Sequence, residues 1–141
     1  MISTLVFIGA GNVATNMAKA FRKTDYKVLQ VYSRTIGHAQ MLANEIHAEF
    51  TNNPAKIRTD ADGYIFSVKD DALPEILRRM PKTNGTWIHT AGSVPMHIFA
   101  PYIANYGVIY PLQTFSKKLA VNFTDIPLFI EANNNETREI L

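Results

Sequence analysis

The 141-residue chain contains no cysteine. This absence excludes a disulfide scaffold, a thiolate zinc site, an iron–sulfur cluster and a cysteine nucleophile. The histidines show neither an HxxxH nor an HExxH spacing, so we expect no zinc-protease site and no metal site. The apolar run from Ile2 to Ile8 is too short to span a bilayer and lacks the basic segment and cleavage site of a secretory leader. We therefore expect a cytoplasmic protein with no membrane association.

Charge is sparse as well, at 18% of residues, and 14 basic residues against 12 acidic ones leave a net charge of only +2. An excess this small does not predict a nucleic-acid partner. The basic residues are unevenly placed, because the first 35 positions hold five of them and Asp25 is the only acid there. This local excess favours an anion such as phosphate, although an uneven solvated surface explains it equally well.

Apolar residues make up 47% of the chain, which is enough for one domain with its own core. Short runs rich in β-branched and aromatic residues alternate with stretches of helical periodicity. This order, at about 30 residues per unit, predicts an α/β fold with a doubly wound, mostly parallel sheet. The expected strands are 2–8, 27–33, 48–51, 64–68, 86–91, 108–110 and 127–131, and helices are expected from Asn12, over 37–46 and over 73–80.

Three local features refine these elements. In the second helix we expect Met41 to lie on the buried face with Leu42 and Ile46. Asn53 before Pro54 predicts an N-cap and a brief helix. For the helix over 73–80, the pattern favours Asp70 or Asp71 as the N-cap.

The strongest chemical signal is the sequence G-A-G-N-V-A at positions 9–14, which has the form G-x-G-x-x-A. It follows a predicted buried strand and opens an amphipathic helix, the context that distinguishes a dinucleotide site from a simple glycine turn. Gly9 allows the tight turn, Gly11 lets the backbone approach a pyrophosphate, and Ala14 lets the helix pack against the strand. The helix N-terminus then offers free N–H groups to the anion. We therefore predict a Rossmann dinucleotide-binding fold.

The end of the second strand indicates which dinucleotide binds. A site for NAD places an acid about 20 residues after the glycines, where it binds the ribose hydroxyls. This chain has Ser33, Arg34 and Thr35 there instead. Hydroxyls and a guanidinium bind a 2′-phosphate, which a carboxylate would repel. We therefore predict NADP(H) as the cofactor, with Arg34 stacking on adenine or pairing with the phosphate; a solvated loop arginine is the alternative.

Three later segments also follow strands, at the edge where ligands bind in doubly wound sheets. We expect Lys69 either to contact phosphate or substrate or to be an ordinary surface lysine. His89 lies within a strand pattern, so we expect a satisfied core or half-buried histidine rather than a catalytic group. The small residues after it leave room for a nicotinamide, and Ser93 is either a helix cap or a substrate contact. Gln113 is a candidate for the cleft, although its aromatic neighbours favour packing.

Five segments together, G-A-G-N-V-A, Y-S-R-T, S-V-K-D-D-A-L, H-T-A-G-S-V and Y-P-L-Q-T-F, resemble a known group. It is the NADP-binding N-terminal domain of a Rossmann-like oxidoreductase family whose members carry a C-terminal helical domain of unknown function. That family is similar to pyrroline-5-carboxylate reductase and to the deazaflavin-dependent NADP reductases, within the 6-phosphogluconate dehydrogenase-like group. The resemblance implies cofactor contacts at Gly9, Ala10, Gly11, Asn12, Val13, Ser33, Arg34, Thr35, Val68, Lys69, Thr90, Ala91 and Gly92.

The resemblance also implies a division of the chain. Residues 1–132 form the dinucleotide-binding domain, and residues 133–141 begin a helix leading to a C-terminal helical domain that this chain lacks and that makes homodimers of the family. We expect an oxidoreductase, or its cofactor-binding half, in which NADPH supplies the hydride for an unidentified small substrate. No catalytic residue is assigned. A non-catalytic module that senses the nucleotide, and a domain for another adenylate, are the alternatives.

Overall fold

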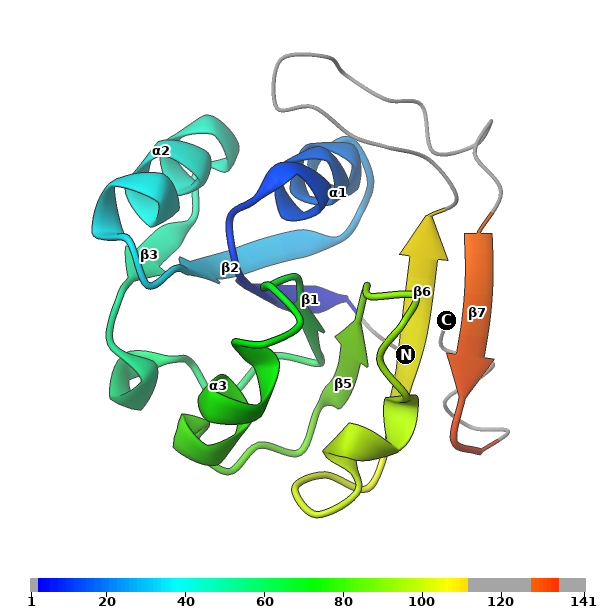
Figure 1. Cartoon of the computed structure of the whole chain (residues 1–141). Helices are drawn as coiled ribbons and strands as arrows, with labels where there is room; N and C mark the ends of the chain where they lie inside the picture. Colours follow the sequence, from blue (N-terminus) through cyan, green and yellow to red (C-terminus); the bar gives the residue numbers. More distant parts are fainter. Residues whose placement is uncertain (1–2, 112–127, 135–141) are drawn as a thin grey trace.

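The computed structural model describes residues 3–111 and 128–134 (Figure 1). Within these ranges the strands form one seven-stranded sheet in the order β3-β2-β1-β4-β5-β6-β7. The first six strands are mutually parallel, and β7 is antiparallel to β6. The strands are β1 (Thr4–Ile8), β2 (Lys27–Tyr32), β3 (Glu49–Thr51), β4 (Gly63–Phe66), β5 (Thr86–His89), β6 (Tyr106–Pro111) and β7 (Leu128–Ala132).

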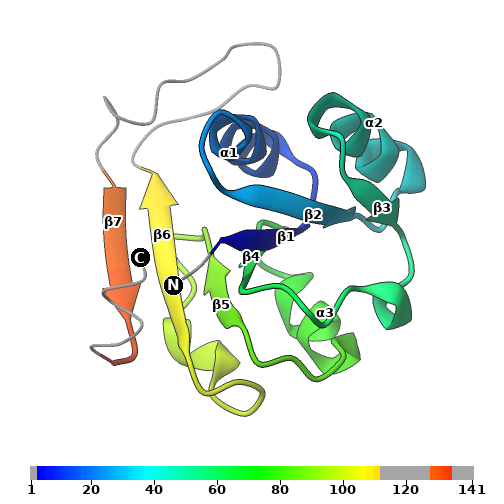
Figure 2. The ribbon, with the colours of Figure 1, turned by 180° about the vertical axis from the view of Figure 1, so that it is seen from behind.

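Helices cover both faces of the sheet (Figures 1 and 2). The two longer helices, α1 (Asn12–Arg22) and α2 (Ile36–Ile46), lie on one face, and α3 (Leu73–Arg79) lies on the other. Two 3-10 turns, η1 (Pro54–Lys56) and η2 (Met96–Phe99), complete the connections. The predicted α/β class with a doubly wound, mostly parallel sheet is therefore confirmed.

The strand pattern of β1 explains how the sheet separates two core layers. Side chains alternate along a strand, so Leu5 and Phe7 join the layer under α1 and α2, while Val6 and Ile8 join the layer under α3. All four are at most 2% exposed, which explains why this strand lacks polar residues over its central positions. The α3 layer also holds the aromatic rings of Phe66, Trp87 and Phe99, with centroids 5.2 to 5.9 Å apart.

Two local predictions are wrong. Met41 is 63% exposed, because the inward positions of α2 are Ala39, Leu42, Ala43 and Ile46, and Met41 falls outside that stripe. Neither Asp70 nor Asp71 caps α3. A turn in which the Ala72 N–H donates to the Lys69 carbonyl carries the chain past both aspartates, and α3 begins with Pro74 in its first turn and no side-chain cap.

Three further predictions have different outcomes: one is confirmed, one differs at the ends of two strands, and one is not tested. The Asn53 carboxamide oxygen accepts the N–H of Ala55 at 3.0 Å, so it is the N-cap of η1. β4 and β5 end at Phe66 and His89, two residues earlier than expected, because the chain turns there into loops at the edge of the sheet. The helix expected over 133–141 lies outside the described residues from position 135 onward.

Within 3–111 and 128–134, none of the helices has the length and apolar content needed to cross a membrane. In the same residues, no group of three or more His, Asp or Glu side chains could hold a metal ion.

Asp62, just before β4, joins three strands at the amino-terminal edge of the sheet. Its Oδ2 accepts the Ser3 N–H at 2.9 Å, the Ser3 hydroxyl at 3.0 Å and the Thr4 N–H at 3.1 Å. Its carbonyl accepts the Thr86 N–H at 2.9 Å. The Ser3 backbone hydrogen bond is the main reason why the pKa of this carboxyl is lowered, and its charged form is therefore stabilised by folding.

We predict that Asp62→Asn lowers the free energy of unfolding by about 1 kcal/mol at pH 7, because charge-assisted hydrogen bonds are roughly twice as strong as neutral ones. Since the folded pKa is depressed, this stabilisation is fully present above the unfolded pKa of about 4 and is lost as the pH falls through the folded value. Urea unfolding at pH 7 and at pH 3 measures the difference. Asp25→Asn, at an exposed position between α1 and β2, is the control. An equal loss at both pH values would contradict the prediction.

Candidate functional site

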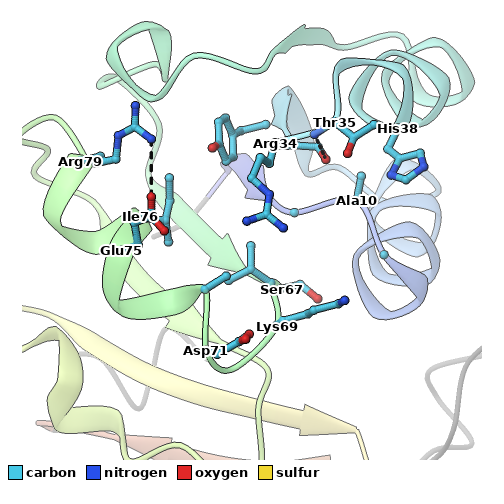
Figure 3. Close-up of a pocket in the computed structure, with 16 residues that line it drawn as sticks. Ala10, Arg34, Thr35, His38, Ser67, Lys69, Asp71, Glu75, Ile76 and Arg79 are labelled. Carbon is cyan, nitrogen blue, oxygen red and sulfur yellow. Dashed lines mark hydrogen bonds and ion pairs between the residues drawn. The ribbon is translucent and has the colours of Figure 1, made fainter.

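A cleft of about 530 Å³ opens at the carboxyl ends of β1, β2 and β4 (Figure 3). β1 lies between the other two strands. The strands that follow β1 in the chain are added first on one side of it, as β2 and β3, and then on the other side, from β4 onward. Such a crossing point is where ligands bind in open α/β sheets. Residues from four segments line the cleft: the turn after β1, the β2–α2 loop with the start of α2, the loop after β4, and α3.

Gly9 brings the turn after β1 against the end of β4. Its φ is +115°, and a Cβ at this position would lie 2.2 Å from the carbonyl oxygen of Ser67. The Gly9 N–H donates to the Tyr32 carbonyl at 2.7 Å, and the Ser67 N–H donates to the Ile8 carbonyl at 2.7 Å. The turn is therefore held between β2 and β4 at a spacing that only glycine permits.

Gly11 has a different role, since a Cβ there would meet no atom within 4 Å. It is the N-cap residue of α1, with φ at −78°, a value open to any residue. The first turn of α1 carries no acidic residue, and no side chain caps it. The N–H groups of that turn and the positive end of the helix dipole are therefore free to receive an anion.

The β2–α2 loop brings two hydroxyls and a guanidinium to the same cleft. Ser33 is buried, and its hydroxyl accepts the Thr35 N–H at 3.3 Å. Arg34 is exposed, and among the described residues it forms neither a hydrogen bond nor an ion pair. Thr35 precedes α2 without capping it through its side chain. Donors for an anionic group are thus present just after β2, in a loop that itself carries no carboxylate.

Eight of the thirteen predicted site residues line this cleft, namely Gly9, Ala10, Gly11, Ser33, Arg34, Thr35, Val68 and Lys69. Asn12 and Val13 begin α1 beside it without lining it. Ala91 and Gly92 line a separate hollow of about 440 Å³ beside η2, and Thr90 lines neither.

Two hydrogen bonds connect the loop after β5 to the loop after β4. The Thr90 hydroxyl donates to the Ser67 hydroxyl at 3.2 Å, and the Ser93 hydroxyl donates to the Asp70 carboxylate at 2.9 Å. Ser93 therefore holds a neighbouring loop rather than capping a helix. Gln113, the remaining cleft candidate, lies outside the described residues.

The cleft also contains residues that are not among the predicted contacts: Tyr32, His38, Ser67, Asp71, Ala72, Glu75, Ile76 and Arg79. His38 lies three residues after Thr35 in α2, so helical spacing from the motif is a signal that could have found it. The members from α3 had no such signal, because the packing of α3 against the sheet brings them to the end of β2.

His89 is a core residue, as expected, with only 1% of its surface exposed. Its Nδ1 accepts the Ala91 N–H at 3.1 Å, which places the proton of the neutral ring on Nε2. That Nε2 is buried and forms no hydrogen bond of ordinary geometry in the part of the chain that is described, although the backbone of Pro95 and Val94 lies near enough to oppose the effect of burial on the pKa of the ring. Burial lowers the pKa of His89, and the ring is therefore neutral at pH 7.

We predict that Gly9→Ala lowers the free energy of unfolding by about 3 kcal/mol, because alanine is strained at positive φ and its Cβ would overlap the Ser67 carbonyl. Gly11→Ala, where the Cβ has free space, should cost less than about 1 kcal/mol. Trp87, the single tryptophan and 2% exposed, reports urea unfolding by its fluorescence. Equal costs for the two variants would show that the turn relaxes without the constraint at Gly9.

Comparison with known proteins agrees with this architecture. Residues 4–88 match the family model described as NADP oxidoreductase, coenzyme F420-dependent. No curated protein sequence matches the chain.

Solved structures extend the similarity over nearly the whole chain. A Bacteroides fragilis protein with the provisional description of NADP oxidoreductase is 42% identical, with a TM-score of 0.86 over 96% of this chain and 54% of its own. A pyrroline-5-carboxylate reductase from Coxiella burnetii is 15% identical, with a TM-score of 0.78 over 99% of this chain and 54% of its own. A reductive aminase from Aspergillus terreus, solved with NADPH, is 23% identical, with a TM-score of 0.65 over 81% of this chain and 42% of its own.

The chain thus spans about half the length of these structures. At their low identities, the reductase and the aminase show the fold alone. The family match covers more than half of the chain, includes the glycine turn and the β2–α2 loop, and agrees with the resemblance of the motifs. The chain therefore belongs to the family of coenzyme F420-dependent NADP oxidoreductases, as a Rossmann-like domain.

Proposed function

We propose that the cleft binds NADP(H), and that the chain is the cofactor-binding half of an oxidoreductase that moves hydride between NADPH and a small substrate. One observation carries the proposal. The uncapped first turn of α1 lies beside the cleft that the unpaired guanidinium of Arg34 lines, and the loop that carries Arg34 has no acidic residue.

The residues around the glycine turn fit a pyrophosphate. Gly9 keeps the turn close to β4, and the open space at Gly11 leaves the backbone N–H groups of the first α1 turn accessible. The helix dipole adds positive potential there. The accessible N–H groups and the helix dipole together provide positive potential for a pyrophosphate from the backbone alone. Lys69, exposed and also lining the cleft, adds a charge from the loop after β4.

The β2–α2 loop fits the 2′-phosphate that distinguishes NADP(H) from NAD(H). Arg34 can donate two parallel N–H groups to phosphate oxygens, and the hydroxyls of Ser33 and Thr35 lie beside it. An acid at this position would instead bind the ribose hydroxyls of NAD and repel the phosphate. The cleft therefore favours the phosphorylated cofactor.

The nicotinamide cofactor, when bound, supplies the hydride, and the protein orients it. The β5 loop is fixed beside the β4 loop by the Thr90–Ser67 and Ser93–Asp70 hydrogen bonds. His89, neutral and buried beneath this loop, has no exposed nitrogen and does not act as the proton donor.

We predict that the chain binds NADPH at least about tenfold more tightly than NADH, because a charge-assisted phosphate contact is worth on the order of 1.5–3 kcal/mol. Isothermal titration calorimetry with each cofactor measures this ratio. Arg34→Ala should weaken NADPH about tenfold and leave NADH within about twofold. Equal affinity for both cofactors in the unmodified chain would refute the assignment of the 2′-phosphate site.

Gly11→Ala separates the pyrophosphate contact from the 2′-phosphate contact. The added methyl group stands where the backbone would approach the ligand, so NADPH and NADH should both weaken, by about tenfold or more. The same titrations measure this, and the unfolding free energy of the variant checks that the fold is intact. A loss confined to NADPH would place the pyrophosphate elsewhere.

A further inference from the structure

The cleft contains polar groups beyond those of the β2–α2 loop, one at the end of β2 and others on α3. Tyr32, the last residue of β2, is only 6% exposed and belongs to the α3 core layer. Its side chain lines the cleft, and in the described residues no group forms a hydrogen bond with its hydroxyl. Burial raises the pKa of this phenol, the charges of Arg79 and Arg34 oppose the rise, and the charge of Glu75 adds to it. The hydroxyl is therefore an unused donor near two guanidinium groups.

Arg79, in the last turn of α3, is the second of these cations. Its only ion pair among the described residues is with Glu75, one turn earlier, at 3.9 Å. Both side chains are more than half exposed, at 59% and 62%, so the pair is weak and easily exchanged. Figure 3 shows Arg79 and Arg34 at the same cleft from different elements, α3 and the β2–α2 loop.

The charge of the proposed ligand requires more than one cation. A phosphomonoester carries about −1.5 to −2 charges near pH 7, and Arg34 neutralises only one of them. The positive end of α1 is placed beside the glycine turn, next to the proposed pyrophosphate position. His38 also lines the cleft. A second permanent charge on this side of the cleft comes from Arg79.

We propose that Arg79 of α3 and the Tyr32 hydroxyl at the end of β2 form a second determinant of specificity for the 2′-phosphate, and that Arg79 exchanges Glu75 for the phosphate when the ligand binds. The proposal rests on NADP(H) binding in this cleft. It assigns Glu75 an opposing role, because its carboxylate pairs with Arg79 in the free protein and would repel a phosphate held beside it.

The test uses the adenosine end of the cofactor alone. Adenosine 2′,5′-bisphosphate and 5′-AMP differ only in the 2′-phosphate, and calorimetry gives the Kd of each. Arg79→Gln should weaken the bisphosphate about tenfold and leave AMP within about twofold. Tyr32→Phe should weaken the bisphosphate about threefold, and Glu75→Gln should tighten it about twofold, again without a change for AMP.

Arg78→Gln is the matched control. It removes the same charge from the neighbouring position of α3, which is exposed and does not line the cleft, so both nucleotides should bind as they do to the unmodified chain. If Arg78→Gln and Arg79→Gln weakened binding of the bisphosphate equally, Arg79 would act only through the net charge of the protein, and the proposal would be overturned. Thermal unfolding of each variant checks that the fold is intact.

The outcomes separate this inference from the function on which it depends. If Arg34→Ala weakens the bisphosphate selectively and Arg79→Gln does not, NADP(H) binding stands and the α3 determinant is refuted. If the unmodified chain binds the bisphosphate no more tightly than AMP, both fail. Selective loss in Arg79→Gln, with a smaller combined loss in the double variant than the sum of the single losses, shows that the two arginines bind one phosphate.

Discussion

The close approach of the glycine turn to β4 is the constraint on which the cleft depends. Gly9 lies at positive φ against the Ser67 carbonyl, with no space for a side chain. Its N–H is bonded to the end of β2, and β4 is bonded to the end of β1, so the ends of three strands converge at one point. From this turn the chain enters α1 directly, and the first turn of that helix therefore faces the cleft.

The charges around this cleft come from elements that are distant in sequence. Arg34 follows β2, Lys69 follows β4, and Arg79 ends α3. The carboxylates nearby are Asp71 and Glu75, and Glu75 is engaged with Arg79. A doubly charged phosphate and a pyrophosphate need separate sources of positive potential. In the proposed binding of NADP(H), the helix dipole of α1 and the side-chain cations would meet these needs at different places in the same cleft.

Several features could be predicted from the sequence because their causes are local. The buried run of β1, the glycines at 9 and 11, and the Asn53 cap depend on neighbouring residues alone, and the structure contains all of them. Two predictions failed for different reasons. The aspartate cap on α3 failed because a local turn precedes that helix, whereas Met41 faces outward because the contact of α2 with the sheet buries Ala39, Leu42, Ala43 and Ile46 instead.

The sequence by itself determined the fold class, the turn at Gly9 and the chemical character of the β2 end, since each follows from residue types at short spacing. Only the tertiary structure decided which distant groups share the cleft with them. Tyr32 reaches it through its position at the end of a central strand, and Arg79 reaches it through the packing of α3. The physical reason is that spacing along the chain sets the direction of a side chain, whereas the burial of two apolar layers sets which elements become neighbours.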